Sequence, residues 1–191
     1  MIRVEGVPSE MSDEALIAAC GAGANAALGA LYDRHAPAVR RFLARLSGTD
    51  DRDLDDLVQA TFEVVVGAAK KFDHRSTGRT WLLGIANNTA RHHVRTEVRR
   101  RRLVEEATAG ATRGESADPR SEAAQHQRAA RLQEAILALP LKLREAFVLV
   151  YLEGLPGAEV ARMLDAREGT IWKRLHEARA KLRVVLEGER S

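Results

Sequence analysis

The chain has 191 residues with a net charge of +3, and its 4% of aromatic residues and wealth of helix formers argue against an all-β domain. Its single cysteine, Cys20, excludes an internal disulfide framework, and no apolar run reaches the roughly 18–20 residues that span a bilayer. The acidic N-terminus is unlike a secretion signal. We therefore expect a soluble, intracellular, mostly helical protein.

The first part of the chain predicts a helical bundle followed by a basic helix. Apolar residues recur at helical spacing over 13–19, 26–31, 32–46, 54–66 and 81–102. The third of these helices ends at Ser47-Gly48-Thr49, and the fourth is capped by Asp50 or Asp53, since carboxylates suit a helix N-terminus. Residues 73–79 break the pattern and predict a loop.

The second part predicts another small helical body. Residues 105–127 lack apolar anchors and predict a flexible linker. Pro140 ends or restarts a helix, and Glu153-Gly154 forms a turn. We thus predict an all-α fold of two small helical domains, an N-terminal bundle and a C-terminal helix-turn-helix. The expected divisions are a tail over 1–11, a domain over 12–104, the linker, and a domain over 128–187. Met11 is an alternative start.

Charge is concentrated in two opposite clusters. Five Asp residues lie between Asp50 and Asp56, and six Arg residues lie between Arg91 and Arg102. Like charges at this density repel, so each cluster is a solvated helix face or meets a partner of opposite sign. For the arginines we favour a polyanion, because neutralising phosphates is the usual task of such a stripe.

The spacing over 156–175 is typical of a helix-turn-helix. Val160, Ala161 and Leu164 face inward from a first helix, and Ile171 and Leu175 face inward from a second. The turn position that is often Gly is Asp165, which tolerates a left-handed backbone. A plain helical hairpin with a basic outer face is the alternative. As a helix-turn-helix, the second helix would enter the major groove.

Four segments in order resemble the extracytoplasmic-function (ECF) group of bacterial RNA polymerase sigma factors, in the sigma-70 family. They are Leu31-Tyr32-Asp33-Arg34-His35; Asp55-Asp56-Leu57-Val58-Gln59-Ala60-Thr61-Phe62; Trp81-Leu82-Leu83-Gly84-Ile85-Ala86-Asn87-Asn88; and the distal set Leu139-Pro140, Arg144, Glu159-Val160-Ala161 and Gly169-Thr170-Ile171. The resemblance covers about residues 12–186 apart from the linker. It implies that 12–104 is sigma region 2 and 128–187 is sigma region 4.

The resemblance also implies roles for individual residues. Binding to the β′ clamp helices of core RNA polymerase is assigned to Asp55, Asp56, Gln59 and Phe62, although a core position is the favoured interpretation for Phe62. Recognition and opening of the −10 element falls to Phe72, Asp73, Arg75, Arg79, Asn88, Arg91, Arg95, Arg99 and Arg100, with Arg101 and Arg102 in the same run. Reading of the −35 element falls to Thr170, Trp172, Lys173, Arg174, His176, Glu177 and Arg179.

The recognition helix departs from the family pattern. Trp172 stands where a basic residue is usual, and Lys173 where Ser is usual. Trp172 would contact a thymine methyl or pack in an interface, and Glu177 could accept a hydrogen bond from a cytosine amino group. An unusual −35 preference is expected.

The leading hypothesis is a bacterial, cytoplasmic sigma factor that binds core polymerase (β′ clamp helices and β flap) and promoter DNA. The resemblance also implies an anti-sigma factor that could hold the chain near the membrane without insertion. A stand-alone helix-turn-helix repressor is the alternative. An enzyme is not expected, because no HExxH, GxSxG or phosphate-binding glycine loop is present, and no cofactor or metal is expected.

Overall fold

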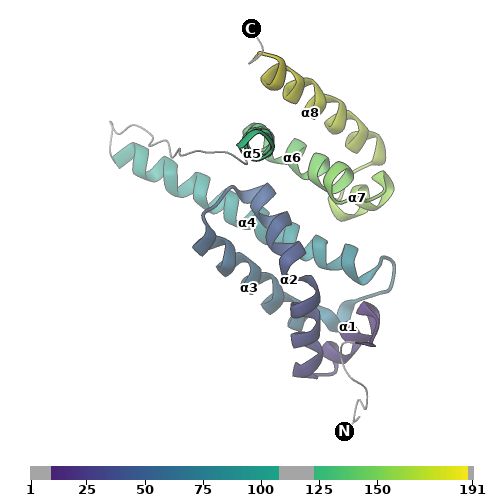
Figure 1. The fold of residues 1–191 in the computed structure, drawn as a ribbon. Coiled ribbons are helices and arrows are strands. Elements are labelled where there is room, and N and C mark those ends of the chain that lie inside the picture. The colour runs from purple at the N-terminus through teal and green to yellow at the C-terminus, as the bar shows by residue number, and fades with distance from the viewer. Residues whose placement is uncertain (1–9, 108–122, 189–191) are drawn as a thin grey trace.

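A computed structural model describes the backbone over 10–107 and 123–188 and the side chains over 10–100 and 130–185. Every regular element in these ranges is helical, which confirms the all-α prediction (Figure 1). The elements are α1 (Asp13–Gly21), α2 (Asn25–Ser47), α3 (Asp51–Ala68), η2 (Ala69–Lys71), α4 (Gly78–Ala107), α5 (Ala123–Ala138), α6 (Leu141–Phe147), η3 (Val148–Leu152), α7 (Gly157–Met163) and α8 (Glu168–Gly188). Residues 1–9 of the tail predicted over 1–11, the centre of the predicted linker, and the side chains of Arg101 and Arg102 lie outside the described residues.

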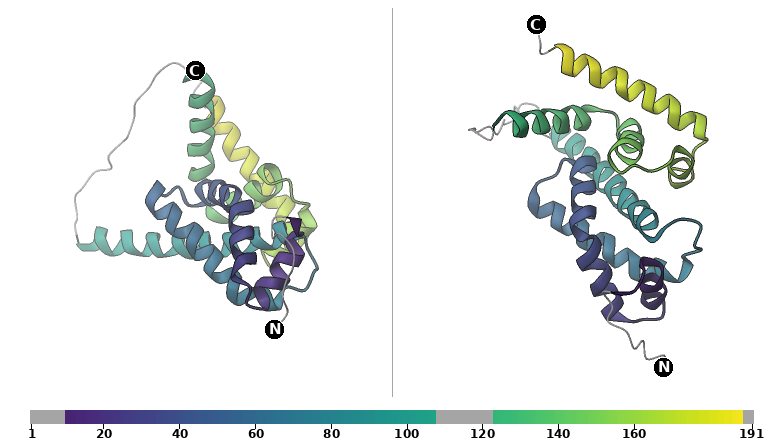
Figure 2. Two further views of the ribbon diagram at one scale, coloured as in Figure 1. Left: turned by 60° about the horizontal axis from the view of Figure 1, so that its bottom comes forward. Right: turned by 45° about the vertical axis from the view of Figure 1, so that its right-hand side comes forward.

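Helices α1–α4 form the N-terminal body around one apolar core. Ile17 from α1, Phe42 and Leu46 from α2 and Val65 from α3 are all at most 1% exposed. The views in Figure 2 show α2, α3 and α4 packed side by side. Cys20 is also buried, and this burial raises the pKa of its thiol.

Local signals set the helix ends in this body. The Asp50 carboxylate accepts a hydrogen bond from the Asp53 N–H (3.0 Å), so Asp50 is the N-cap of α3. This choice between Asp50 and Asp53 had been open at the sequence level. Gly48 ends α2 in the left-handed conformation (φ 63°), which a residue with a Cβ rarely adopts.

Helix α4 begins where α1 approaches it closely. The Gly78 N–H donates to Glu14 Oε1 (2.9 Å), and this hydrogen bond lowers the pKa of Glu14. A Cβ at position 78 would lie 2.5 Å from the Cβ of Asp13. Glycine is therefore required here for close packing of two helices.

Helices α5–α8 and η3 form the C-terminal body. Ile136, Leu149, Val160, Ile171 and Leu175 fill its core. α7 and α8 are joined by a tight turn in which Asp165 has φ 47°, as the sequence predicted for the glycine-like position.

Two helices are longer than the sequence predicted. α4 continues to Ala107 rather than Arg102, and α5 begins at Ala123, before the predicted start of the distal domain at residue 128. Arg, Glu and Ala are strong helix formers, so these ends stay helical without the apolar periodicity on which the sequence prediction depended. The helices thus enter both ends of the stretch expected to be a linker.

Candidate nucleic-acid interface and partner surfaces

The acidic cluster lies on the outer face of α3. Asp55, Asp56 and Gln59 are exposed there. Asp55 and Asp51 both bind the guanidinium of Arg40 from α2, at 3.0 and 2.8 Å. Arg40 neutralises part of the cluster and joins α2 to α3. Asp56 remains exposed, and the amide nitrogen of Gln59 donates to Glu63 (2.9 Å), so that Gln59 offers its amide oxygen to a partner.

Phe62 is 4% exposed, so it is mainly a core residue. Its ring lies 4.8 Å from that of Tyr32, which is 44% exposed. Together with Leu28, Gln59 and Val66 these rings line a shallow groove of about 460 Å³ between α2 and α3. The groove places apolar surface directly beside the acidic face.

The loop before α4 is built around Phe72. This ring packs against His74 (4.6 Å between centroids) and Trp81 (5.3 Å). His74 has φ 57°, a conformation that is uncommon for a residue with a side chain. The carboxylate of Asp73 accepts from the Arg75 N–H (3.2 Å), which shapes the turn. The loop therefore presents a half-buried aromatic side chain beside charged groups.

The basic residues of α4 divide into two groups. Asn88, Arg95, Arg99 and Arg100 are exposed, and Arg100 is paired with Glu97 (3.0 Å). Arg79 and Arg91, by contrast, contact carboxylates of the C-terminal body. The sequence predicted that Arg91 belongs to one basic cluster with Arg95 and Arg99, but in the structure the C-terminal body partly covers Arg91.

Arg91 contacts Glu145 of α6 at 3.2 Å, and Asn87 donates to the same carboxylate oxygen at 3.1 Å. Glu145 is only 2% exposed. Burial raises the pKa of Glu145, although the positive charges of Arg91, Arg174 and Arg95 oppose the rise. Helices α4, α6 and α8 therefore converge on one buried carboxylate.

A second carboxylate links the two bodies near the start of α4. Glu153 follows η3, and its side chain is 7% exposed. One oxygen contacts Arg79 (2.7 Å) and the other contacts Arg45 of α2 (2.9 Å). Glu153 thus joins α2 and the start of α4 to the C-terminal body.

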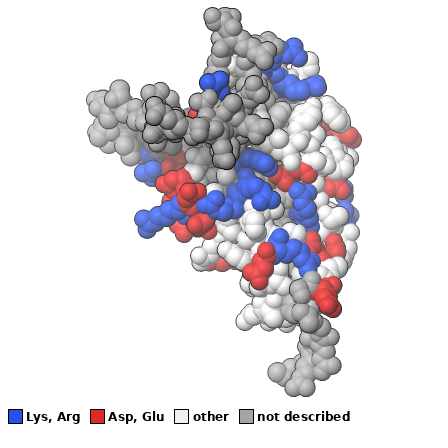
Figure 3. All heavy atoms as spheres, in the orientation of Figure 1, with Lys and Arg blue, Asp and Glu red and all other residues white. Residues whose placement is uncertain are grey.

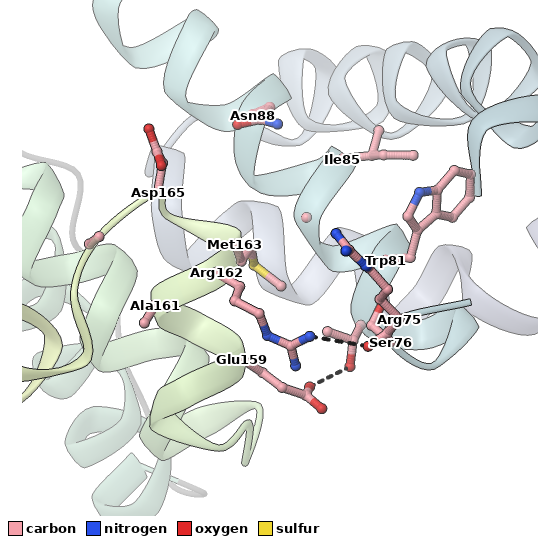
Figure 4. Close-up of a pocket in the computed structure, with 13 residues that line it drawn as sticks. Arg75, Ser76, Trp81, Ile85, Asn88, Glu159, Ala161, Arg162, Met163 and Asp165 are labelled. Atoms are coloured by element: carbon pink, nitrogen blue, oxygen red, sulfur yellow. Dashed lines mark hydrogen bonds between the residues drawn. The ribbon is translucent and has the colours of Figure 1, made fainter. Parts of the chain in front are cut away.

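Helix α7 lies opposite the first turns of α4 across a cleft of about 670 Å³ (Figure 4). Thr80 donates to Glu159 (3.2 Å), and Arg162 donates to the backbone carbonyl of Arg75 (3.2 Å). Trp81 and Asn88 lie on the α4 side of the cleft. The helix-turn-helix therefore faces the segment expected to open −10 DNA.

Arg144 ties helix ends together across the interface. Its guanidinium donates to the carbonyls of Leu46 at the end of α2 and of Leu137 and Leu139 near the end of α5. Burial lowers its pKa, and the carbonyls accept hydrogen bonds from its two terminal nitrogens, whereas its buried Nε has no hydrogen-bond partner among the described residues. Arg144 is a structural residue in this arrangement.

The outer face of α8 carries the predicted −35 residues. Thr170, Lys173, His176, Glu177 and Arg179 are exposed, whereas Ile171 and Leu175 are buried. This separation of faces is as the sequence predicted. Arg174 differs, because it is half-buried and its charge acts on the carboxylate of Glu145.

Trp172 combines exposure with packing. It is 52% exposed, and its indole N–H donates to Glu168 (3.3 Å). The position of a Cβ added to Gly157 would be 3.1 Å from the indole ring, so Trp172 lies against the start of α7. It is not a core residue, and part of its surface is open to a ligand.

Sequence reasoning missed the groups that join the two bodies: Arg45, Asn87, Glu145 and Glu153. One signal was available. Glu145 occupies the apolar face of its helix, four residues before the buried Leu149, and a carboxylate there requires a partner.

Acidic and basic side chains lie next to one another across the middle of the face in Figure 3. No helix in the described ranges is long and apolar enough to cross a membrane. The same residues hold no group of three or more His, Cys, Asp or Glu side chains placed to bind a metal ion.

Comparison with known proteins identifies the family. Residues 31–100 match the family model Sigma-70 region 2, and residues 129–182 match Sigma-70, region 4. The ECF RNA polymerase sigma factor SigM of Mycobacterium tuberculosis is 34% identical over 178 residues, which cover 93% of this chain and 86% of SigM. The chain is an ECF sigma factor of the sigma-70 family. Sigma factors are transcription initiation factors and not catalysts.

Solved sigma factors share the fold. CnrH, solved in complex with the cytosolic domain of CnrY, is 28% identical with a TM-score of 0.67, over 93% of this chain and 99% of CnrH. RpoE from Bartonella quintana, solved with the anti-sigma factor NepR, has a TM-score of 0.62 at 24% identity, over 82% of this chain and 94% of RpoE. The all-α architecture of this sigma factor is thus that of its family.

Proposed function

We propose that this sigma factor binds core RNA polymerase, reads the −35 element with α7 and α8, and recognises and opens the −10 element with its N-terminal body. The observation that carries this proposal is the order of the two family matches on two helical bodies. Each body also presents the charged face that its role requires. The division into region 2 over 12–104 and region 4 over 128–187 is part of the proposal.

The α3 face is the surface proposed for the β′ clamp helices. Asp55, Asp56 and Gln59 offer acceptors to a basic partner, and the adjoining groove offers the rings of Tyr32 and Phe62. An apolar groove beside charged groups is the usual composition of a protein interface.

The C-terminal body offers a second partner surface, which we assign to the β flap. An apolar groove between α5 and α8 is lined by Leu139, Val184 and Val185. Val184 is 72% exposed and Val185 is 41% exposed, so the two residues form a contiguous exposed apolar patch beside the groove, and such patches mark interaction sites.

The −10 element is assigned to Phe72, Asp73, Arg75, Arg79 and the exposed face of α4. Asn88, Arg95 and Arg99 recur along that face, so the arginines can follow a phosphate backbone while Asn88 and Phe72 meet a base. Opening about ten stacked steps costs on the order of 14 kcal/mol. Stacking one flipped base returns only about 1–3 kcal/mol. Melting must therefore be shared with the polymerase.

The −35 element is assigned to the outer residues of α8. The side of α8 that faces away from the core carries Lys173, Arg179 and the partly exposed Trp172. Each good bidentate base contact would contribute about 1–3 kcal/mol of discrimination. Phosphate contacts from the same helix would set its register.

We also propose control by an anti-sigma factor in the bacterial cytoplasm. The solved relative CnrH accommodates a protein segment while retaining this fold. The groove between α2 and α3 and the groove between α5 and α8 are candidate contact surfaces.

Co-purification and transcription with bacterial core polymerase test the function. Wild-type chain should co-purify with core enzyme and support run-off transcription from a genomic promoter library. Asp55→Asn with Asp56→Asn should weaken core binding about five- to ten-fold, since two exposed charges are removed. Glu134→Gln, an exposed carboxylate on α5, is the control.

Failure to bind core enzyme in the absence of an inhibitor would refute the sigma-factor function. Tight, specific duplex binding by the isolated chain would instead favour the stand-alone repressor.

A further inference from the structure

Two contacts hold the indole ring of Trp172 on α8. Its N–H donates to Oε1 of Glu168, one helical turn earlier (3.3 Å). Its six-membered ring lies on the buried backbone of Gly157, where α7 packs against α8 (Figure 1). A Cβ added to Gly157 would be 3.1 Å from Cζ2 and 3.4 Å from Cε2 of the indole. The ring is therefore fixed on two sides, while Trp172 remains 52% exposed.

The hydrogen bond to Glu168 decides what the exposed part of the indole can recognise. The N–H is the only hydrogen-bonding group of a tryptophan side chain. Because Glu168 accepts from it, the surface that remains for a partner is apolar carbon. The base edges in the major groove present hydrogen-bond donors and acceptors, and their apolar group is the C5-methyl of thymine. The surface of Trp172 is therefore matched to thymine.

The charges around the indole direct it toward a base and not toward a phosphate. The carboxylate of Glu168 is exposed and repels a phosphate placed beside the ring. Lys173 and Arg179 are exposed on the same helix and supply cations for the DNA backbone. Arg179 follows Trp172 by seven residues, so the two lie on the same side of α8. Backbone binding and base reading thus fall to different side chains.

We propose that Trp172 selects thymine in the −35 element, and that Glu168 and Gly157 are positioning residues that present its apolar surface to the C5-methyl group. This inference rests on the proposed function for the entry of α8 into the major groove of the −35 element. It names the base that this contact selects. It also gives a role to Glu168 and Gly157, which are outside the predicted DNA-binding set.

Deoxyuridine tests the contact, because it differs from thymidine only in lacking the C5-methyl group. Holoenzyme formed with bacterial core polymerase selects duplexes from a library randomised over the length of a promoter. Each selected −35 thymine is then replaced singly by deoxyuridine. At one position the replacement should weaken binding of the wild-type holoenzyme about four-fold, the factor expected for one buried methyl group.

Two variants of α8 locate the source of this preference. Trp172→Ala should bind the thymine and deoxyuridine duplexes equally, because the apolar partner of the methyl group has been removed. Lys173→Ala is the matched control at the neighbouring exposed position. It should weaken binding to both duplexes by the same factor and leave the preference for thymine unchanged.

Two substitutions of Glu168 separate its positioning role from its charge. Glu168→Gln keeps an oxygen that can accept from the indole, whereas Glu168→Ala does not. Both remove a negative charge and should strengthen overall DNA binding to a similar extent. The preference for thymine over deoxyuridine should persist in Glu168→Gln and be reduced toward equal binding in Glu168→Ala.

Gly157→Ala tests the second contact. The added methyl group would displace the indole, while alanine favours the helical backbone of α7. The preference for thymine should fall with no loss of helical circular dichroism. Gly67→Ala on α3 is the control, because a Cβ there meets nothing within 4 Å. It should leave the preference unchanged.

The proposal is wrong if wild type binds every −35 duplex equally with thymine and with deoxyuridine, or if the preference survives in Trp172→Ala. The positioning role of Glu168 is wrong if Glu168→Gln and Glu168→Ala change the preference equally. The same comparison is repeated with the full chain alone at low salt, on duplexes that the chain itself selects. A chain that prefers the methyl group in this assay but never binds core enzyme would refute the proposed function while supporting the role of Trp172.

Discussion

The two bodies of this sigma factor are held together internally by one kind of interaction and to each other by another. Inside each body, side chains such as Phe42 and Leu175 are fully buried among apolar neighbours. Between the bodies, the named contacts are ion pairs and hydrogen bonds centred on Glu145, Glu153 and Arg144. Apolar burial is non-directional and large, whereas ion pairs depend on geometry and on solvent. We therefore expect the bodies to separate more readily than either unfolds.

The largest expected effect is in the two cores. Phe42→Ala should lower the free energy of unfolding by about 3–5 kcal/mol and Leu175→Ala by about 2–5 kcal/mol, since each leaves a cavity. Urea unfolding followed by circular dichroism measures both. Val184→Ala, at an exposed position, should change the free energy of unfolding by less than about 0.5 kcal/mol. Equal losses at all three positions would contradict the assigned cores.

Two glycines of α4 compare packing within a body with packing between bodies. Gly78→Ala places a Cβ 2.5 Å from that of Asp13 and should cost about 1–3 kcal/mol. Gly84→Ala places a Cβ 3.6 Å from Met163 across the cleft, which is ordinary contact. It should be neutral or stabilise the helix by about 0.5–1 kcal/mol. Melting temperatures would show whether the contact between the two bodies accommodates the added methyl group without loss of stability.

Acidification should strengthen the contact between the two bodies through Glu145. Burial raises the pKa of this carboxyl above its ordinary value of 4.5, so the packed bodies bind a proton more readily than separated bodies. This contribution is complete below pH 4.5 and is lost as the pH rises through the raised pKa. The radius of gyration of wild type should therefore fall as the pH is lowered from neutral toward 4.5. Glu145→Gln should lack the part of this pH response that comes from Glu145. An identical dependence of the radius of gyration on pH in both proteins would exclude Glu145 as its source.

The smallest expected effect is at the junction of α1 and α2. Asp13 contacts Arg34 (2.7 Å) and His35 (2.9 Å). Burial opposes ionisation, but these contacts outweigh it and lower the pKa of Asp13 below 3.8. Its contribution is present above pH 3.8 and is lost as the pH falls through the lowered pKa. Asp13→Asn should cost at most about 1 kcal/mol at pH 7, and less near pH 2. Chemical unfolding at both pH values measures the difference.

Short-range patterns predicted most of the fold. Helical periodicity located the apolar stripes of α2 and α3, and the helix-turn-helix spacing identified Asp165 as the turn residue that takes a left-handed backbone. The same patterns underestimated α4 and α5, because their charged ends are helical by propensity and have no apolar face. The exposure of candidate site residues such as Asp56, Asn88 and Lys173 was also predictable, because helical periodicity decides which residues face away from the core.

The sequence alone was enough for the elements, the two cores and the outward charged faces, because each depends on residues within one or two helical turns. Only the tertiary structure decided which arginines are free. Asn87 meets Glu145 across 58 positions, and Arg79 meets Glu153 across 74. No local spacing encodes such a pair, because the pair depends on how the two folded bodies pack against each other.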